Sequence, residues 1–162
     1  MTELQGSRTA IGCRFALVVS RFNEAITEGL LRGARAVLAE SGVRDEDITI
    51  ARVPGAFELP LAARRLAASG AFDAIVCLGC VIKGDTMHFE YIAGAASQGI
   101  MDAGLQTGVP VGFGLLTTLT EAQAAERAGD GPGNKGREAA LAAVEMASLA
   151  RRLPGGSSRG EH

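Results

Sequence analysis

The sequence contains no tryptophan, one tyrosine and two histidines, and aromatic residues make up only 4% of its 162 residues. Proteins that stack nucleic-acid bases use aromatic side chains, and proteins that follow a phosphate backbone carry an excess of basic residues. Here 16 basic residues stand against 18 acidic ones, which leaves a formal charge of -2. The composition therefore argues against a nucleic-acid partner.

Long apolar runs are also missing. None approaches the roughly 18 residues of a membrane helix, and the first ten residues are polar, without the apolar core of a signal peptide. We therefore expect no membrane partner and a cytoplasmic location.

Cysteine is scarce. Cys13, Cys77 and Cys80 are an odd number in a chain large enough to fold without cross-links, which favours reduced thiols in a reducing compartment. Cys77 and Cys80 have the spacing of a redox pair, but residues three apart on a strand point to opposite faces. A zinc site needs three or four ligands, and only one histidine lies outside the C-terminal end. We expect neither redox chemistry nor a bound metal.

Four short apolar segments stand out in a sequence whose 47% hydrophobic and 21% charged residues are ordinary for a globular protein. Three segments are nearly continuous, as in strands of a parallel sheet that are buried on both faces, and one alternates like an edge strand. The continuous segments are Phe15–Ser20, Ala74–Ile82 and Val109–Leu116, and the alternating one is Ile48–Val53.

Capping residues delimit five helices between and after these segments. The third contains Gly94 and Gly99, each of which lowers helix stability by about 1 kcal/mol relative to alanine. We therefore expect another backbone to approach this helix closely. The predicted helices run from the N-cap Asn23 to the C-cap Gly42, from about Leu59 to Gly70, from about Thr86 to Gln106, from Thr120 to Gly129, and from Asn134 to about Leu153.

The alternation of strands and helices predicts an α/β protein, a three-layer α/β/α sandwich around a four-stranded parallel sheet. A single domain over residues 11–153 accounts for all of these segments, with an N-terminal arm over residues 1–10 and a disordered tail over residues 154–162. Ligands of such sheets bind beyond the carboxyl ends of the strands. Function is therefore expected in the loops that follow the strands.

The loops after the first two strands each carry a candidate residue. Phe22 follows the first strand, where its ring either packs on the core or faces a ligand. The second strand is followed by the segment VPGAFELP, which places Glu58 at the start of a helix. A carboxylate there also complements the helix dipole, so this position alone does not establish a site.

The loop after the third strand carries the strongest chemical signal. Gly84 and Thr86 precede a helix, so several backbone amides are able to point at one anion, although an ordinary N-cap gives the same pattern. His88 follows at once, and an imidazole is suited to proton transfer near neutral pH. The loop position favours a functional histidine over a structural one.

Two cations, Arg127 and Lys135, flank the glycine-rich turn near the end of the chain. Taken alone, solvated surface charges are the better interpretation of these residues, but beside a phosphate they become its cationic partners. This turn lacks the Gly-Lys-Ser/Thr of a nucleotide-phosphate loop, and no dinucleotide fingerprint occurs in the sequence. Ordinary nucleotide binding therefore loses support.

Taken in order, these loops contain five motifs: FN, VPGAFELP, LGCVIKGDTMHFEYI, FGLLTT and ERAGDGPGNKG. Their order and spacing closely resemble the 6,7-dimethyl-8-ribityllumazine synthase family over about residues 15–153. The resemblance implies a flavodoxin-like fold and the penultimate step of riboflavin biosynthesis. In that step 5-amino-6-(D-ribitylamino)uracil and 3,4-dihydroxy-2-butanone 4-phosphate condense to 6,7-dimethyl-8-ribityllumazine, phosphate and water, without a metal or an organic cofactor.

The resemblance also implies a homopentamer whose sites lie between neighbouring subunits. One subunit then supplies groups for both substrates, and the adjacent subunit supplies the rest. The first group comprises Phe22 on the pyrimidine ring, Ala56, Phe57 and Glu58 near the ribityl chain, the backbone of Val81 and Ile82 at the uracil edge, and Asp85, Thr86 and the proton-transferring His88 at the phosphoketone. The second comprises Phe113 as a pocket wall, Arg127 at the phosphate and Lys135 at the uracil end.

Two residues depart from the family pattern. Cys80 stands where threonine or another small residue is expected, and Asp85 puts a carboxylate beside the predicted phosphate loop, so its side chain has to point away from the anion. The turn 129–136 is short, as it is in relatives that build 60-subunit shells, so a shell, an isolated pentamer and a decamer all fit. Residues 1–10 are expected to pair with the sheet edge of a neighbouring subunit.

Three other functions fit the same fold class. A riboflavin synthase of this fold would release no phosphate, and Arg127 with the Gly84–Thr86 loop argues against it. A flavin- or nucleotide-binding module would bind without turnover, and a purely structural shell protein would assemble without activity. Formation of product separates an enzyme from the last two.

Overall fold

Strands and helices alternate along the chain in the computed structural model, which describes residues 1–155. The strands are β1 (Phe15–Ser20), β2 (Ile48–Val53), β3 (Ala74–Ile82) and β4 (Val111–Thr118). The helices are α1 (Glu24–Glu40), α2 (Leu59–Ala68), α3 (His88–Thr107), α4 (Glu121–Ala128) and α5 (Lys135–Arg152). Short 3-10 helices, η1 (Asp45–Asp47) and η2 (Ala56–Glu58), precede β2 and α2.

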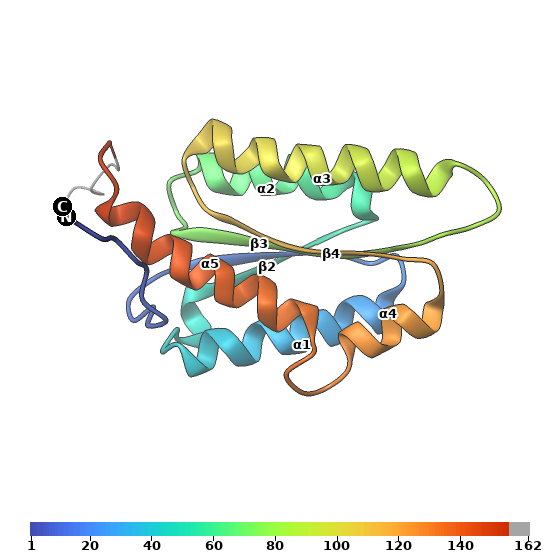
Figure 1. Cartoon of the computed structure of the whole chain (residues 1–162), viewed down its shortest axis with the longest axis horizontal. Helices are drawn as coiled ribbons and strands as arrows, with labels where there is room; N and C mark the ends of the chain where they lie inside the picture. The colour runs from blue at the N-terminus through green and yellow to red at the C-terminus, as the bar shows by residue number, and fades with distance from the viewer. Residues whose placement is uncertain (156–162) are drawn as a thin grey trace.

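The four strands are all parallel and lie in the order β2-β1-β3-β4. Helices α2 and α3 cover one face of this sheet, and α1, α4 and α5 cover the other (Figure 1). The predicted three-layer α/β/α sandwich is therefore confirmed. Strand β2 lies at an edge, as its alternating sequence predicted.

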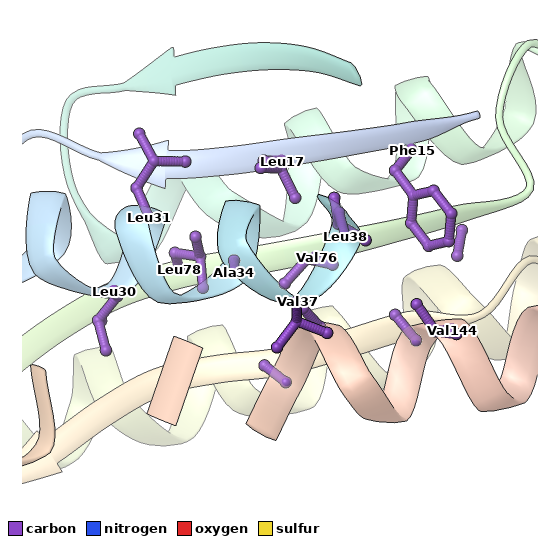
Figure 2. Close-up of a cluster of buried hydrophobic side chains, with 14 of the residues drawn as sticks. Phe15, Leu17, Leu30, Leu31, Ala34, Val37, Leu38, Val76, Leu78 and Val144 are labelled. Carbon is purple, nitrogen blue, oxygen red and sulfur yellow. The ribbon is translucent and has the colours of Figure 1, made fainter. Parts of the chain in front are cut away.

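Side chains of β1 alternate between two hydrophobic layers. Phe15, Leu17 and Val19 pack between the sheet and helices α1 and α5 (Figure 2), whereas Ala16 and Val18 pack toward α2 and α3. Because β1 is buried on both faces, its sequence is continuously apolar. The helices thus cover both faces of the sheet, and the loops at the carboxyl ends of its strands are left accessible.

The predicted bounds of the fourth strand are wrong by two residues at each end. Pro110 has no amide hydrogen for the strand ladder, so β4 begins at Val111. The β-branched Thr117 and Thr118 continue the pairing with β3, so the strand runs past Leu116. The expectation of burial on both faces is also wrong, because β4 is the other edge strand and leaves Phe113 half exposed.

Most helix ends follow the predicted capping residues. Gly42 and Gly70 adopt left-handed φ angles of 89° and 75° just past α1 and α2. The side chains of Thr120 and Asn134 each accept a hydrogen bond from the backbone amide of the third residue of the helix, in α4 and α5 respectively. The start of α3 is an exception, since this helix begins at His88 and not at Thr86.

The N-terminal arm, residues 1–10, lies along the C-terminal half of α5 of its own chain. The amide of Ser7 donates to Ser148 Oγ at 3.0 Å, Arg8 pairs with Glu145 at 3.1 Å, and Arg152 donates to the backbone oxygen of Gln5 at 2.7 Å. The predicted tail begins with the described turn residues Pro154 and Gly155, and the rest of it lies outside the described residues.

Over residues 1–155, no helix combines the length and the apolar character needed to cross a membrane.

Candidate active site

Three loops meet where β1, β2 and β3 end, and they carry most of the predicted site residues. The loop after β1 lies between the other two because β1 is flanked by β2 and β3. Its backbone amides join the loop after β2, with Arg21 donating to Val53 at 2.9 Å and Phe22 donating to Pro54 at 3.1 Å. Its third residue joins β3, since Asn23 Nδ2 donates to the backbone oxygen of Cys80 at 3.1 Å.

Two phenylalanine rings point outward from these loops. Phe22 is 70% exposed and Phe57 is 62% exposed, so neither ring is tucked onto the core. Ala56 is buried at the base of the same loop, and Glu58 is exposed at the start of α2 without a side-chain capping bond. Exposed rings at the carboxyl edge of a sheet are available to stack on a planar ligand.

The loop after β3 presents unused backbone donors. Within the described residues, the amides of Gly84, Asp85 and Thr86 make no hydrogen bond, while Thr86 Oγ1 accepts the amide of His88 at 3.4 Å. Asp85, Thr86 and His88 are all exposed. The loop is therefore able to direct several N–H groups at one anion beside an imidazole.

The ends of β3 and β1 are staggered. Pairing between them stops at Val19 and Leu78, but β3 continues to Ile82. The amide of Lys83 donates to β4 at Thr118, so alternation along the strand turns the backbone of Ile82 to the same side as the Cys80 oxygen. Val81 and Ile82 are half-buried there. The backbone of Ile82 is left without a strand partner on the side of the candidate site.

Three predicted residues lie away from these loops. Phe113 is 52% exposed in the middle of β4, on the face where its alternate neighbours Val111 and Leu115 pack toward α2 and α3. Arg127 is in the last turn of α4 and Lys135 is the first residue of α5, both on the opposite face of the sheet from α3 (Figure 1). A single chain therefore does not bring the two cations and His88 together on one face.

Both cations bind to groups of their own helices. Arg127 Nη1 donates to the backbone oxygen of Gln123 at 2.9 Å, and Lys135 Nζ lies 2.8 Å from Glu138 Oε2. A guanidinium has five N–H donors, so the bond to Gln123 leaves most of them available to a phosphate.

The sequence predicts Asn134 only as a helix cap, but in the structure its side chain also joins the turn between α4 and α5 to α1. Its Nδ2 donates to the backbone oxygens of Gly29 and Gly129, each at 3.0 Å, while its Oδ1 accepts the amide of Arg137 at 3.1 Å. The side chain is buried and holds the turn between Arg127 and Lys135 against α1. Three-way bonding of this kind depends on contacts distant in sequence, so no local pattern predicts it.

Sequence reasoning also predicted Asn23 as the N-cap of α1. It occupies that position, but its side chain makes no capping bond and instead reaches Cys80. Asparagine tolerates the left-handed backbone that the turn requires, and this was the one signal available in the sequence.

The cysteines are buried thiols without a disulfide. Cys77 and Cys80 lie in opposite hydrophobic layers, as predicted for residues three apart on a strand. Burial raises the pKa of Cys77 to about 12 and that of Cys80 to about 11, which disfavours the reactive thiolate. The Cys80 side chain therefore belongs to the core, and only its backbone oxygen takes part in the loop contacts.

No group of three or more histidine, cysteine, aspartate or glutamate side chains among residues 1–155 is arranged to hold a metal ion.

Comparison with known proteins shows the family of the chain. The family model for 6,7-dimethyl-8-ribityllumazine synthase matches residues 12–151. A protein of that name from Syntrophus aciditrophicus (strain SB) is 52% identical over 152 residues, covering 94% of this chain and 99% of its own. Another from Desulfatibacillum aliphaticivorans is 50% identical over 150 residues, covering 93% of this chain and 97% of its own. The chain belongs to the 6,7-dimethyl-8-ribityllumazine synthase family.

Proposed function

We propose that the chain condenses 5-amino-6-(D-ribitylamino)uracil with 3,4-dihydroxy-2-butanone 4-phosphate, the reaction of its family in riboflavin biosynthesis, at a site completed by a neighbouring subunit. The observation that carries the proposal is the division of the candidate residues. The aromatic rings, open backbone and imidazole gather at one edge of the sheet, while Arg127 and Lys135 lie across it. A second subunit is the simplest source of the missing cations.

The pyrimidine is held by the loops after β1, β2 and β3. The ring of Phe22 stacks on the planar heterocycle, and the unpartnered backbone of Ile82 bonds the uracil edge, with Val81 beside it. Ala56, Phe57 and Glu58 line the ribityl chain, since η2 places this segment next to the loop that carries Phe22. Lys135 and Phe113 of the neighbour close the pocket.

The phosphoketone is held by the loop after β3. The unused amides of Gly84, Asp85 and Thr86 bind phosphate oxygens, and Arg127 of the neighbour adds a charged donor. These groups stabilise the negative charge that grows on the phosphate as it leaves. Asp85 is compatible with this role only if its carboxylate points to solvent, where it is exposed.

The condensation of the two bound substrates depends on several proton transfers, and neither substrate needs strong activation. The uracil 5-amino group attacks the ketone and loses a proton, and the carbinol oxygen gains one and leaves as water. The carbon next to the imine then loses a proton as phosphate departs, which leaves an enol that tautomerises to a second carbonyl. The ribitylamino nitrogen attacks this carbonyl, and a second water leaves as the ring closes. His88 is exposed at the start of α3 and accepts and returns these protons in turn. Holding both reactants in contact supplies much of the remaining acceleration.

We propose a homopentamer as the working assembly, with a 60-subunit shell of pentamers as its larger form. Helix α3 supports this proposal because Tyr91, Met101 and Leu105 are 70%, 60% and 74% exposed along it. At Gly94 an added methyl group would have no described atom within 4 Å. The helix therefore has both exposed apolar area and room for a neighbouring backbone.

The state of the cysteines supports the proposal of a cytoplasmic location. All three cysteines are reduced and buried, which fits a compartment that keeps thiols reduced.

The decisive experiment combines an assay with complementation. Purified wild-type protein mixed with both substrates is expected to form the fluorescent lumazine and to release phosphate in equal amounts, and light scattering on the same sample gives the particle mass. Absence of lumazine would contradict the proposed reaction, and a monomer mass would contradict the assembly.

Complementation tests the shared site directly. His88→Ala and Arg127→Ala are each expected to be weakly active, but after joint unfolding and reassembly about a quarter of the sites receive both native residues, because each site draws on two subunits. Reassembly of each variant alone is the matched control. A mixture no more active than its components would show that His88 and Arg127 act within one chain.

A further inference from the structure

The turn from β1 into α1 is built on an unusual backbone. Asn23 has φ 61° and ψ 51°, and it is the only residue other than glycine with a positive φ within residues 1–155. Side chains other than those of asparagine and aspartate rarely adopt this conformation. Glycine would meet the backbone requirement alone, so the presence of a side chain here needs a separate explanation.

That side chain does not cap the helix. The backbone oxygen of Asn23 already begins α1 by accepting the amides of Ile26 and Thr27 at 3.0 and 3.1 Å, whereas its Oδ1 makes no capping bond. Its Nδ2 instead donates to the backbone oxygen of Cys80 in β3 at 3.1 Å. The left-handed turn is what directs the side chain across to the neighbouring strand.

The contact lies where β3 runs on past β1. Strand pairing between them ends at Leu78, so the Cys80 oxygen would otherwise lack a partner from β1. Two residues further, on the same side of the strand, is the open backbone of Ile82. The Asn23 side chain thus supplies the hydrogen bond that β1 no longer makes. It does so at Cys80, just before the backbone of Ile82, which remains without a partner on this side in the described part of the chain.

Hydrogen bonds to the loop after β2 and to β3 therefore hold the backbone at Phe22. Its own amide donates to Pro54 after β2, and the residue that follows it is bonded to β3. Its ring remains 70% exposed, so its position depends on this backbone and not on core packing. The distance between the ring and the backbone of Ile82 is therefore controlled by the Asn23 amide.

We propose that Asn23 is a positioning residue for the pyrimidine substrate: through its bond to Cys80 it sets the gap between the Phe22 ring and the Ile82 backbone that receives the heterocycle. This inference rests on the proposed function and specifies how one half of that site is held. Within residues 1–155, Asn23 makes no hydrogen bond to the phosphoketone half, from Gly84 to His88, so we expect that half to keep its geometry without this bond.

Two variants separate the amide from the backbone turn. Asn23→Gly keeps the left-handed conformation without strain and removes the donor. Asn23→Asp keeps the shape and the backbone preference, but places a carboxylate oxygen opposite the Cys80 oxygen. Both are expected to raise the KM for the ribitylaminouracil about 3- to 30-fold, the range for loss of one hydrogen bond that leaves a carbonyl unpaired.

The KM for the butanone phosphate and the particle mass are expected to stay at the wild-type values. Calorimetric titration of the pyrimidine alone checks the same weakening without turnover. A wild-type KM for the pyrimidine in either variant, or an equal rise for both substrates, would overturn the inference. Failure of the wild-type protein to make lumazine would instead contradict the proposed function, so the two failures are distinguishable.

Discussion

The buried amide of Asn134 donates a hydrogen bond of 3.0 Å to the backbone oxygen of Gly29 in α1. These residues lie 105 positions apart in the sequence, and their contact fixes the turn between α4 and α5 to the helix beneath it. Arg127 and Lys135 flank that turn. The Asn134 side chain therefore contributes both to the stability of the fold and to the position of Arg127, the proposed phosphate-binding cation.

Replacement of Asn134 is expected to lower the stability of the fold. Asn134→Ala removes the cap of α5 and takes the Nδ2 donor away from two backbone oxygens, so the free energy of unfolding should fall by roughly 2–4 kcal/mol. Asn134→Asp keeps the capping oxygen and should lose less. Urea denaturation measures both: equal stabilities for the two variants would show that the capping bond contributes nothing, and wild-type stability in Asn134→Asp would show the same of the donated bonds.

His88→Ala is expected to lower kcat about 10- to 1000-fold, which is at or below the usual contribution of a general acid–base group, about 100- to 10,000-fold. The KM values should change little because other groups hold both substrates. Steady-state kinetics with each substrate varied in turn gives the measurement. An unchanged kcat would remove His88 from the mechanism.

Substitution of Gly94 and of Gly99 in α3 by alanine is expected to have different effects on the stability of the chain. A Cβ at Gly99 would lie 2.7 Å from Cβ and Cγ of Pro60, so Gly99→Ala should push α2 from α3 and destabilise the chain by about 1–3 kcal/mol. A Cβ at Gly94 meets nothing in its own chain. Gly94→Ala should leave the fold intact but weaken a pentamer whose subunits pack at this helix.

Thermal unfolding and sedimentation of both variants make this comparison. If Gly94→Ala retained the wild-type particle mass and gained about 1 kcal/mol of stability from helix propensity alone, no neighbouring backbone would lie at Gly94.

The buried cysteines predict a loss of stability at high pH. Their pKa values rise from 9.0 to about 12 for Cys77 and about 11 for Cys80, so the folded state holds these protons after the unfolded state has released them. The stabilisation is complete below pH 9 and declines as the pH rises toward 11, by roughly 2–3 kcal/mol for each thiol.

Urea denaturation from pH 8 to pH 11 should show this decline, and it should be smaller in the Cys77→Ala/Cys80→Ala double variant. Native protein should also resist iodoacetamide at pH 8.5 far longer than unfolded protein does. Rapid alkylation of the native thiols would contradict the burial argument.

Residue type alone predicts the strands that are buried on both faces or alternate cleanly. The bounds of β1, β2 and β3 agree with their apolar segments because burial on both faces, or alternation at an edge, leaves a direct trace in residue type. The loop residues that carry the family motifs were likewise found from the sequence, since parallel strands place their carboxyl ends at one edge. Where β4 begins and ends was less predictable, because its polar threonines join the ladder only through pairing with β3.

The roles of the long-range contacts become visible only in the folded chain. Asn23 has the sequence signature of a helix cap, yet its amide bonds β3; Gly94 and Gly99 look alike in the sequence, yet only Gly99 meets another helix of its own chain. Such outcomes depend on which segments the fold brings together, and a local pattern holds no information about that. For the same physical reason, the separation of Arg127 and Lys135 from His88 by the sheet emerged only when the layers were assembled.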